Sequence, residues 1–405
     1  MTTNVMIPIF LIIFEIYLAS LLGPFLSYLG GKRVQIPVVV GQLLGGVIIG
    51  QSGLRILDLN NPTLLFLYGF GFAIVLFKVG INLPLRDHSL NKALGRGATA
   101  AAAAYVLATP CAFGIARIAH FDHVSILVLL CACSSASVAS RMIDERKLNG
   151  PGLTAIKTWI PISDMSTLAL LPLAMAQGTE WMLGVGIVLA TGAIGFVALK
   201  QFNESKLGVN MRQLSKEKNW ALEMQLYMAG LIGLCILSYR FGASFIVAGF
   251  VMGATATVLR VPGVRFQEQL KGLGEGHYIA AFFVILGAKI DMRALFTSAS
   301  NIELALLIAA GALIVHLVVA KLVRLPLSGG FMAASSMGLP ASIVSTGLTS
   351  GTIRPGQAAA IVTAALISLT FASFGVSLFE KQNKKVPAQA GSAVAPPDSH
   401  DENSG

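Results

Sequence analysis

Charged residues are scarce in this sequence: Asp, Glu, Lys and Arg make up 12% of its 405 residues. A soluble protein carries about a quarter, so an ordinary soluble domain is excluded. Hydrophobic residues account for 55% of the chain, and long apolar runs recur from end to end. A helix of about 20 such residues crosses the hydrocarbon core of a bilayer. We therefore expect a polytopic membrane protein built as one continuous helix bundle.

The chain also lacks the residues that several chemistries need. Its four cysteines lie in apolar segments, and we interpret them as reduced packing residues: Cys111, Cys131, Cys133 and Cys235. No His or acid stands at ligand spacing near the 131–133 pair, which argues against a metal site there. An intramembrane enzyme has little support, because HExxH and mid-depth Ser/His or acidic pairs are missing. Glu15 interrupts the first apolar run and no basic residue precedes it, which argues against a cleaved signal peptide.

Basic residues are unevenly spread, although they give the chain a formal net charge of +10. Twenty of the Lys and Arg residues fall in one set of alternate loops and five in the other. Since cytoplasmic loops carry the excess of Lys and Arg, we place the richer set in the cytoplasm. The N-terminus is then outside and the C-terminus inside. Membrane topology thus explains the positive charge without a nucleic-acid partner.

We count thirteen apolar segments, at 5–29, 34–52, 63–83, 96–119, 124–142, 152–176, 181–200, 219–240, 242–260, 276–292, 300–323, 328–350 and 356–380. They divide as six, one and six, and an odd linker helix inverts the second six, as in inverted-repeat transporters. The predicted fold is all-α, with about 13 transmembrane helices in two inverted six-helix repeats. The tail, 381–405, is rich in Lys, Pro, Ala, Ser and Asp, which is typical of a disordered segment.

The fifth segment is the weakest helix in each half. In the first half, 131–145 is unusually rich in serine, and in the second, 335–351 contains Gly338, Pro340 and Gly347. Paired interruptions at matching positions point to the binding site of a transporter. The alternative is that small residues merely let helices pack closely. We predict two broken helices that cross at mid-depth.

One acid stands near the middle of an apolar segment. Asp164 lies about 12 residues into 152–176, which is about 18 Å deep and close to the bilayer midplane. A carboxylate at that depth must be neutralised by a proton or a cation. Competition between the two for one group is the simplest physical basis of exchange. The alternative is a permanent ion pair between Asp164 and Lys321 or Lys78.

Hydroxyl groups surround this acid in the sequence. Ser163 precedes Asp164, and we expect Ser134, Ser135 and Ser137 of the first interrupted segment to lie near the same cation. Oxygen ligands suit hard cations, and no soft ligand for a transition metal is available. We therefore predict a metal site for Na⁺ or K⁺ at Asp164, without a further cofactor.

The other charged and titratable groups inside apolar segments have more ordinary interpretations. Two lysines near segment ends can extend to the surface: Lys157 and Lys289. Lys78 and Lys321 lie deeper, where a charge needs a partner or a water-filled cavity. Glu223 and Glu15 are possible acids of an ion pathway, although acids near helix ends are usually solvated. We interpret His316 as a hydrogen-bonded spectator that is able to modulate proton transfer.

Three stretches carry a family resemblance: VQIPVVVGQLLGGVIIGQSGL (34–54), FGASFIVAGFVMG (241–253) and FFVILGAKIDMRAL (282–295). They resemble signatures of the monovalent cation:proton antiporters, and the chain is most similar to the Kef-like second branch. The stretches occur in the order and spacing of that family, and the resemblance covers nearly the whole membrane part.

The resemblance implies a site and a mechanism. The family's ion site falls on Ser163-Asp164, and Lys321 matches a charge-compensating Lys or Arg. The implied transmembrane domain, 1–380, divides into scaffold helices, core helices and a linker helix: 5–83 and 219–292, 96–176 and 300–380, and 181–200. Such a protein is a homodimer in the lipid bilayer of the cell. It is a transporter rather than an enzyme, and it exchanges Na⁺ or K⁺ for protons by alternating access.

The sequence departs from the family at two places. Asn82 replaces a glutamate of the third segment, shortly after the unusual Lys78, and Ser163 replaces the first acid of the two-acid, electrogenic members. One acid holds one proton or one monovalent cation, so we predict electroneutral, one-for-one exchange. Two alternatives remain: a channel or sensor on the same fold, and a divergent antiporter with another cargo.

Overall fold

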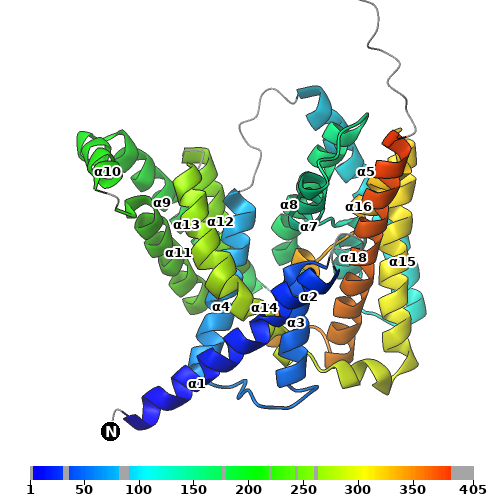
Figure 1. The fold of residues 1–405 in the computed structure, drawn as a ribbon, viewed down its shortest axis with the longest axis horizontal. Coiled ribbons are helices and arrows are strands. Elements are labelled where there is room, and N and C mark those ends of the chain that lie inside the picture. The colour runs from blue at the N-terminus through cyan, green and yellow to red at the C-terminus, as the bar shows by residue number, and fades with distance from the viewer. Residues whose placement is uncertain are drawn as a thin grey trace, which may run out of the picture.

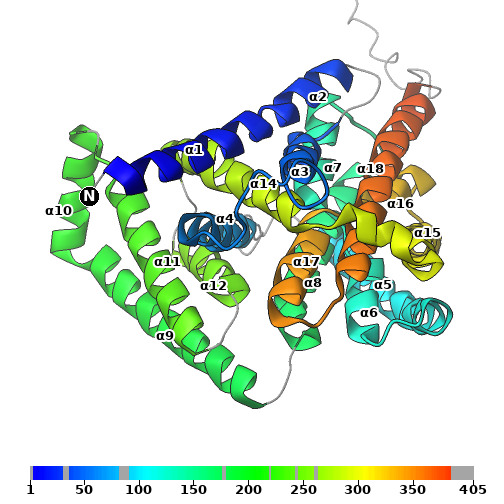
Figure 2. The same ribbon diagram turned by 90° about the horizontal axis from the view of Figure 1, so that it is seen from below.

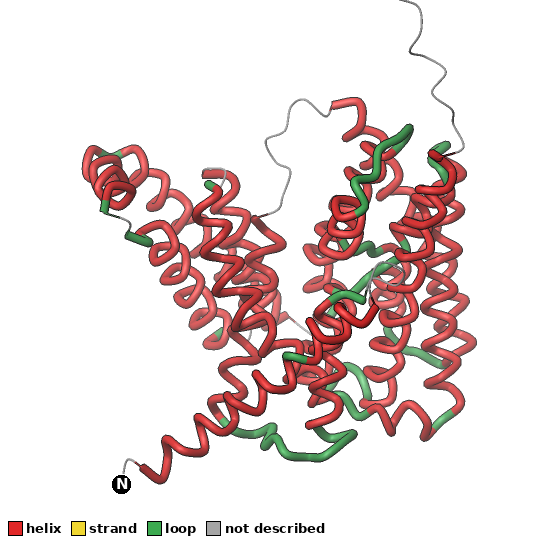
Figure 3. The backbone as a smooth tube through the Cα atoms, in the orientation of Figure 1, coloured by secondary structure: helices red, strands yellow, loops and turns green. Residues whose placement is uncertain are grey.

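The described residues form helices and no strands. The computed structural model describes residues 3–30, 36–81, 91–175, 179–218, 220–241, 245–259 and 263–384. Within these ranges every regular element is helical (Figures 1 and 3). This agrees with the predicted all-α class. Asn82 and the predicted disordered tail from 385 onward lie outside the described residues.

The helices follow one another along the chain with short connections. Their bounds are α1 (Thr3–Ser20), α2 (Leu22–Gly30), α3 (Val38–Ile49), α4 (Pro62–Ile81), α5 (Asn91–Ala119), α6 (Val124–Ala132), α7 (Ala136–Glu145), α8 (Leu153–Ala174), α9 (Thr179–Glu204), α10 (Lys206–Glu217), α11 (Leu222–Arg240), α12 (Phe245–Leu259), α13 (Val264–Leu273), α14 (Ile279–Lys289), α15 (Ala299–Leu322), α16 (Leu327–Ala333), α17 (Gly338–Ser350) and α18 (Pro355–Lys384). A π-helical turn, η2 (Gly274–Tyr278), joins α13 to α14, and a 3₁₀ helix, η3 (Met292–Thr297), precedes α15.

The hydropathy of these helices makes the chain a multi-pass membrane protein. Among the described residues, seven spans are long and apolar enough to cross a bilayer, and three shorter helices are also apolar. The structure places a helix or a pair of helices at each of the thirteen predicted segments, and it adds α10 and α13 between them. The number of crossings and the orientation of the termini stay predictions.

Contacts divide the helices into two groups (Figures 1 and 2). In the first group, α4 packs along α12 and α3 packs along α14. In the second group, α5 contacts α6, α8 and α15, and α18 contacts α15, α16 and α17. Helix α9, the predicted linker, packs on α11 and α12 of the first group. Each group combines helices from both halves of the sequence, as interleaved repeats require.

Glycines bring α3 and α14 into backbone contact. A Cβ atom on Gly46 would overlap the carbonyl of Val284, and one on Gly287 would overlap the carbonyl of Leu43. Small residues of this kind allow membrane helices to approach closely. The close approach fixes one wall of a cavity, because Gln42 of α3 and Phe283 of α14 both line it.

Both predicted helix interruptions are confirmed. Helix α6 ends at Ala132, the next residue Cys133 has an extended backbone, and α7 begins at Ala136. Helix α16 ends at Ala333, and α17 begins at Gly338. Serines at both breaks compete for backbone hydrogen bonds and weaken a continuous helix. Pro340 is tolerated because it lies in the first turn of α17, where backbone N–H groups have no partner within the helix.

Candidate ion-binding site

Asp164 occupies the middle of α8 and faces the first helix break. Its side chain is 7% exposed. The Oδ2 atom accepts a hydrogen bond of 2.9 Å from the backbone N–H of Ala136, the first residue of α7. Helix N-termini stabilise anions in this way. Within the described part of the chain, the buried Oδ1 atom has no hydrogen-bond partner.

Ser163 contributes a second buried oxygen without a partner. Its side chain is fully buried, and among the described residues nothing donates to or accepts from its Oγ atom. Its backbone carbonyl, in contrast, accepts from the Thr167 hydroxyl at 2.8 Å. Buried oxygens are nearly always hydrogen-bonded, so two orphans on successive residues need an explanation. Hydroxyl and carboxylate oxygens are the ligands that hard cations prefer.

The serines of the first break are held differently from one another. Ser134 and Ser135 are both buried, and Ser135 lines the cavity beside Asp164. The Ser134 Oγ atom instead contacts His316 Nε2 at 3.3 Å. Ser137 belongs to α7, but its side chain lies outside the described residues.

His316 is hydrogen-bonded, as the sequence predicts, but its contact with Ser134 of the first break was not predicted. It is fully buried in α15 and stacks on Trp159 with ring centroids 5.5 Å apart. Its Nδ1 atom lies 2.8 Å from the carbonyl oxygen of Ala312. Because a carbonyl only accepts, Nδ1 carries a hydrogen, and Nε2 of the neutral ring accepts from the Ser134 hydroxyl. In the sequence, the signal for this contact was a lone histidine in an apolar segment.

The second break repeats the arrangement of the first with a neutral group. The backbone N–H of Ser336 donates to Ser368 Oγ of α18 at 3.1 Å. The Ser368 hydroxyl donates in turn to the carbonyl of Ala365 at 2.7 Å. A side chain of the following helix therefore caps each break, a carboxylate in the first half and a hydroxyl in the second.

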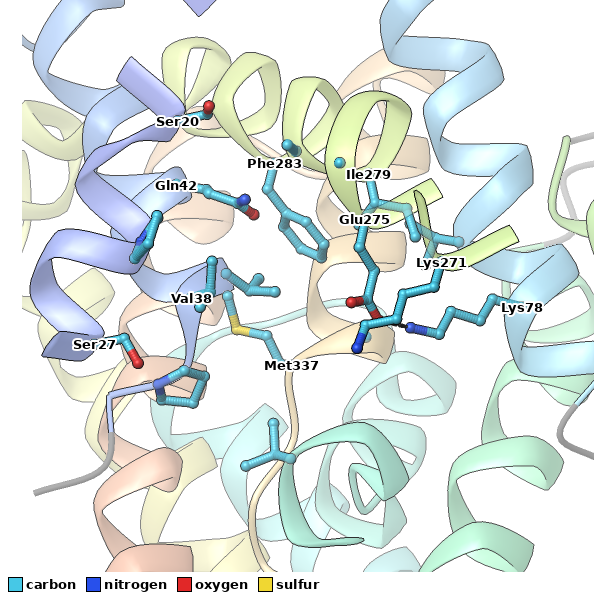
Figure 4. Close-up of a pocket in the computed structure, with 18 of the residues that line it drawn as sticks. Ser20, Ser27, Val38, Gln42, Lys78, Lys271, Glu275, Ile279, Phe283 and Met337 are labelled. Atoms are coloured by element: carbon cyan, nitrogen blue, oxygen red, sulfur yellow. Dashed lines mark hydrogen bonds and ion pairs between the residues drawn. The ribbon is translucent and has the colours of Figure 1, made fainter. Parts of the chain in front are cut away.

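One cavity connects both breaks with the first helix group. It has a volume of about 1080 Å³, and Asp164 lines it together with Ala136 of the first break and Met337 of the second. Figure 4 shows the opposite wall, where polar and charged side chains from α3, α4 and the α13–α14 helix point inward. The exposed residues Glu268 and Lys271 line the same cavity. Asp164 thus shares a cavity with exposed charged residues.

Lys78 lines this cavity but pairs with an acid other than Asp164. Its ammonium group forms an ion pair with Glu275 of η2 (Figure 4). The alternative of a permanent Asp164–Lys78 pair is therefore not observed. Glu275 was not predicted, although a lysine deep in an apolar segment signals that a partner acid exists.

Two other predicted residues lie away from Asp164. The expectation that Lys321 lies deep is wrong, because it is exposed in the last turn of α15. Within the described residues Lys321 makes no ion pair with Asp164, so the structure does not bring the two together. Glu223 lies in the first turn of α11 and does not line the cavity. The exposed side chain of Lys157 agrees with the prediction that it extends to the surface. The same prediction does not hold for Lys289, which is partly buried with its Nζ atom 4.4 Å from the centre of the Tyr68 ring.

Known proteins share this sequence pattern and this fold. The profile of a family described as "Sodium/hydrogen exchanger, transmembrane" matches residues 17–381. YjbQ of Bacillus subtilis, a candidate Na(+)/H(+) antiporter by its name, is 23% identical over 369 residues, which cover 84% of this chain and 58% of YjbQ. The glutathione-regulated potassium-efflux system protein KefC of Salmonella schwarzengrund is 24% identical over 393 residues, covering 90% of this chain and 61% of KefC. The chain thus spans less than two thirds of either relative.

A solved structure has the same arrangement of helices. The sodium proton antiporter MjNhaP1 from Methanocaldococcus jannaschii superposes with a TM-score of 0.57, covering 92% of this chain and 97% of that one. The two sequences are 15% identical, so the likeness concerns the fold. It confirms the predicted all-α fold class.

Proposed function

The chain belongs to the sodium/hydrogen exchanger family, and on that premise we propose that it exchanges Na⁺ or K⁺ for protons across the membrane. The observation that carries the proposal is the buried carboxylate of Asp164, which lines a large cavity. One oxygen accepts from Ala136 N–H, and the other has no partner within the part of the chain that the structure describes. A carboxylate in such a place is neutral only with a proton or a cation on it. It holds one or the other, which couples the two fluxes.

The two helix groups support a proposal of alternating access. In this proposal α5–α8 and α15–α18 form a mobile core that carries Asp164, and the first group forms a scaffold that also provides the homodimer contact. By the positive-inside rule, the exposed cavity residues Glu268 and Lys271 belong to the cytoplasmic side. The cavity is then the cytoplasmic route to Asp164, and movement of the core relative to the scaffold opens the route on the other side.

The first test is proton flux in proteoliposomes that contain a pH-sensitive dye. We expect a gradient of Na⁺ or of K⁺, applied in turn, to drive proton movement through the purified protein. Asp164→Asn keeps an oxygen for the Ala136 N–H group but cannot take up a proton or balance a cation. We therefore expect its flux to fall to that of empty vesicles, while the variant inserts and elutes as wild type.

Asp58→Asn is the matched control, because Asp58 is exposed in the loop before α4, where its side chain accepts a hydrogen bond from the neighbouring Asn60 N–H. This variant should transport at the wild-type rate. Normal exchange by Asp164→Asn would refute the proposal. A channel would move the cation without coupled protons. One-for-one exchange also predicts no membrane potential in the same vesicles, and an ion-driven potential would contradict that stoichiometry.

A further inference from the structure

The Lys78–Glu275 ion pair lies inside the cavity that leads to Asp164. Lys78 comes from α4 and Glu275 from η2, and their side chains are 33% and 30% exposed, respectively. Figure 4 shows both pointing into the cavity, with Lys271 beside them. A positive charge on the route of a cation opposes its entry. The position of Lys78 is therefore unexpected in a cation pathway unless another group cancels its charge.

A local change of helix geometry presents Glu275 to the cavity. Helices α13 and α14 are joined through the π-helical turn Gly274–Tyr278, in which glycines flank Glu275 on both sides. Such turns add a residue to the helix, reorient the side chains that follow and are frequent at functional sites. His277 of the same turn stacks on Tyr17 of α1, with ring centroids 5.5 Å apart. This contact holds the turn from the side of α1.

The charges on the scaffold wall of the cavity cancel. Among the described lining residues, this wall carries two lysines and two glutamates: Lys78, Lys271, Glu268 and Glu275. Asp164, on the opposite wall, is then the unbalanced charge among the described lining residues. We propose that Glu275 is a positioning residue for cation entry, which neutralises Lys78 and leaves Asp164 as the net attraction. This inference rests on the proposed cation exchange.

A simple structural tie between α4 and η2 is the competing explanation of the pair. Substitutions that remove one charge with little change of shape distinguish a structural tie from charge balance. Lys78→Met and Glu275→Gln both break the ion pair, but they remove charges of opposite sign. If the pair is only a tie, both variants lose the same contact and change transport in the same direction. If the pair balances charge, Glu275→Gln leaves the wall positive and Lys78→Met leaves it negative. The two variants then change the apparent KM for the cation in opposite directions.

The experiment measures the cation dependence of proton flux in proteoliposomes for both single variants and for Lys78→Met/Glu275→Gln. We expect Glu275→Gln to raise the apparent KM about tenfold, because an unbalanced positive charge near the path of the cation repels it at intermediate dielectric. The maximal rate should stay within about twofold of wild type. Lys78→Met should lower the apparent KM. The double variant, which restores neutrality, should return to within about twofold of wild type.

Glu380→Gln is the matched control, because Glu380 forms a comparably exposed ion pair with Arg146 away from the cavity. It should leave the apparent KM unchanged. Equal shifts from both single variants, an unshifted Glu275→Gln, or a double variant no better than Glu275→Gln would each overturn the inference. Wild-type vesicles without cation-driven proton flux would refute the proposed exchange and the inference with it. Failure of the inference alone leaves wild-type flux intact.

Discussion

The two helix breaks have one geometry and two different chemistries. In each, the N–H group at the break donates to a side chain of the following long helix, α8 in the first half and α18 in the second. The acceptor is the Asp164 carboxylate in the first break and the Ser368 hydroxyl in the second. The repeat thus supplies a cap twice, and only one of the two caps carries charge.

The difference lies in what each cap leaves unused. The Ser368 hydroxyl accepts from Ser336 N–H and donates to the Ala365 carbonyl, so its hydrogen and a lone pair are both engaged. Asp164 uses one oxygen, and its other, buried oxygen has no hydrogen-bond partner among the described residues. A neutral, satisfied cap needs nothing further, whereas a buried carboxylate needs a proton or a cation. Under the proposed function, the first break therefore serves ion exchange and the second serves structural support.

The breaks also differ in how neighbouring helices hold them. In the first, the Ser134 hydroxyl reaches across to His316 of α15. In the second, the Ser335 hydroxyl turns back to Met332 of its own chain segment at 3.0 Å. The first break is therefore braced from outside, two residues before the N–H group that holds Asp164. Three variants test the contrast between the breaks: His316→Leu, Ser163→Ala and Ser368→Ala. Each is compared with a second variant.

Loss of the external brace should have the largest effect. His316→Leu removes the acceptor of the buried Ser134 hydroxyl and loosens the segment that carries Ala136 N–H. We expect the apparent KM for the cation to rise about tenfold, as is usual when a group that orients an ion ligand is lost. The free energy of unfolding should also fall by about 1–3 kcal/mol, the cost of an unsatisfied buried polar group.

The conservative variant His316→Gln separates positioning from simple packing. A glutamine side chain retains both a hydrogen-bond donor and an acceptor, so it should restore most of the cation affinity. It does not restore the stacked ring on Trp159. If His316→Gln and His316→Leu have the same apparent KM, the brace does not position the site. Flux measurements and thermal unfolding in detergent, on the same preparations, decide between these outcomes.

The sequence was sufficient to predict the parts of the fold that depend on hydropathy and on weak helix formers. Serine-rich 131–145 and glycine-rich 335–351 contain both breaks, because these residues cannot sustain a regular helix in competition with their own side chains. The position of Asp164 near the middle of its helix follows from counting at a fixed rise per residue. Both kinds of signal are local, so a single sequence carries them.

Contacts between distant segments could not be predicted in the same way. The pairing of Lys78 with Glu275 depends on a π-helical turn that shifts the register of one helix, and hydropathy does not record that shift. The family resemblance assigned a role to Lys321, yet it is His316 that contacts the first break. Five residues rotate a helix by about 140° beyond one full turn, so the two side chains leave α15 on different sides, His316 buried and Lys321 exposed.

The orphan hydroxyl beside Asp164 gives a smaller expected effect. Ser163→Ala removes an oxygen that has no partner among the described residues, so no hydrogen bond is lost. If that oxygen is a cation ligand, the apparent KM should rise a few-fold, about the effect of one weak neutral ligand, with stability unchanged or higher. Ser342→Ala, in α17 just after the second break, is the contrast, because the Ser342 hydroxyl donates to the Gly338 carbonyl at 2.8 Å. That variant should lose some stability and keep its cation affinity.

The neutral cap should matter least for transport. Ser368→Ala leaves the buried N–H of Ser336 without its acceptor, which costs about 1 kcal/mol, as for other helix caps. Ser377→Ala is the control, nine residues further along α18. It removes the hydrogen bond from the Ser377 hydroxyl to the Ser373 carbonyl and should lower the free energy of unfolding by less. Both variants should exchange cations within about twofold of the wild-type rate, since neither touches the charged cap. A large loss of flux in Ser368→Ala, at unchanged melting temperature, would mean that the second break also binds the ion. The division of labour between the two breaks would then be wrong, because both caps would have to change occupancy during each transport cycle.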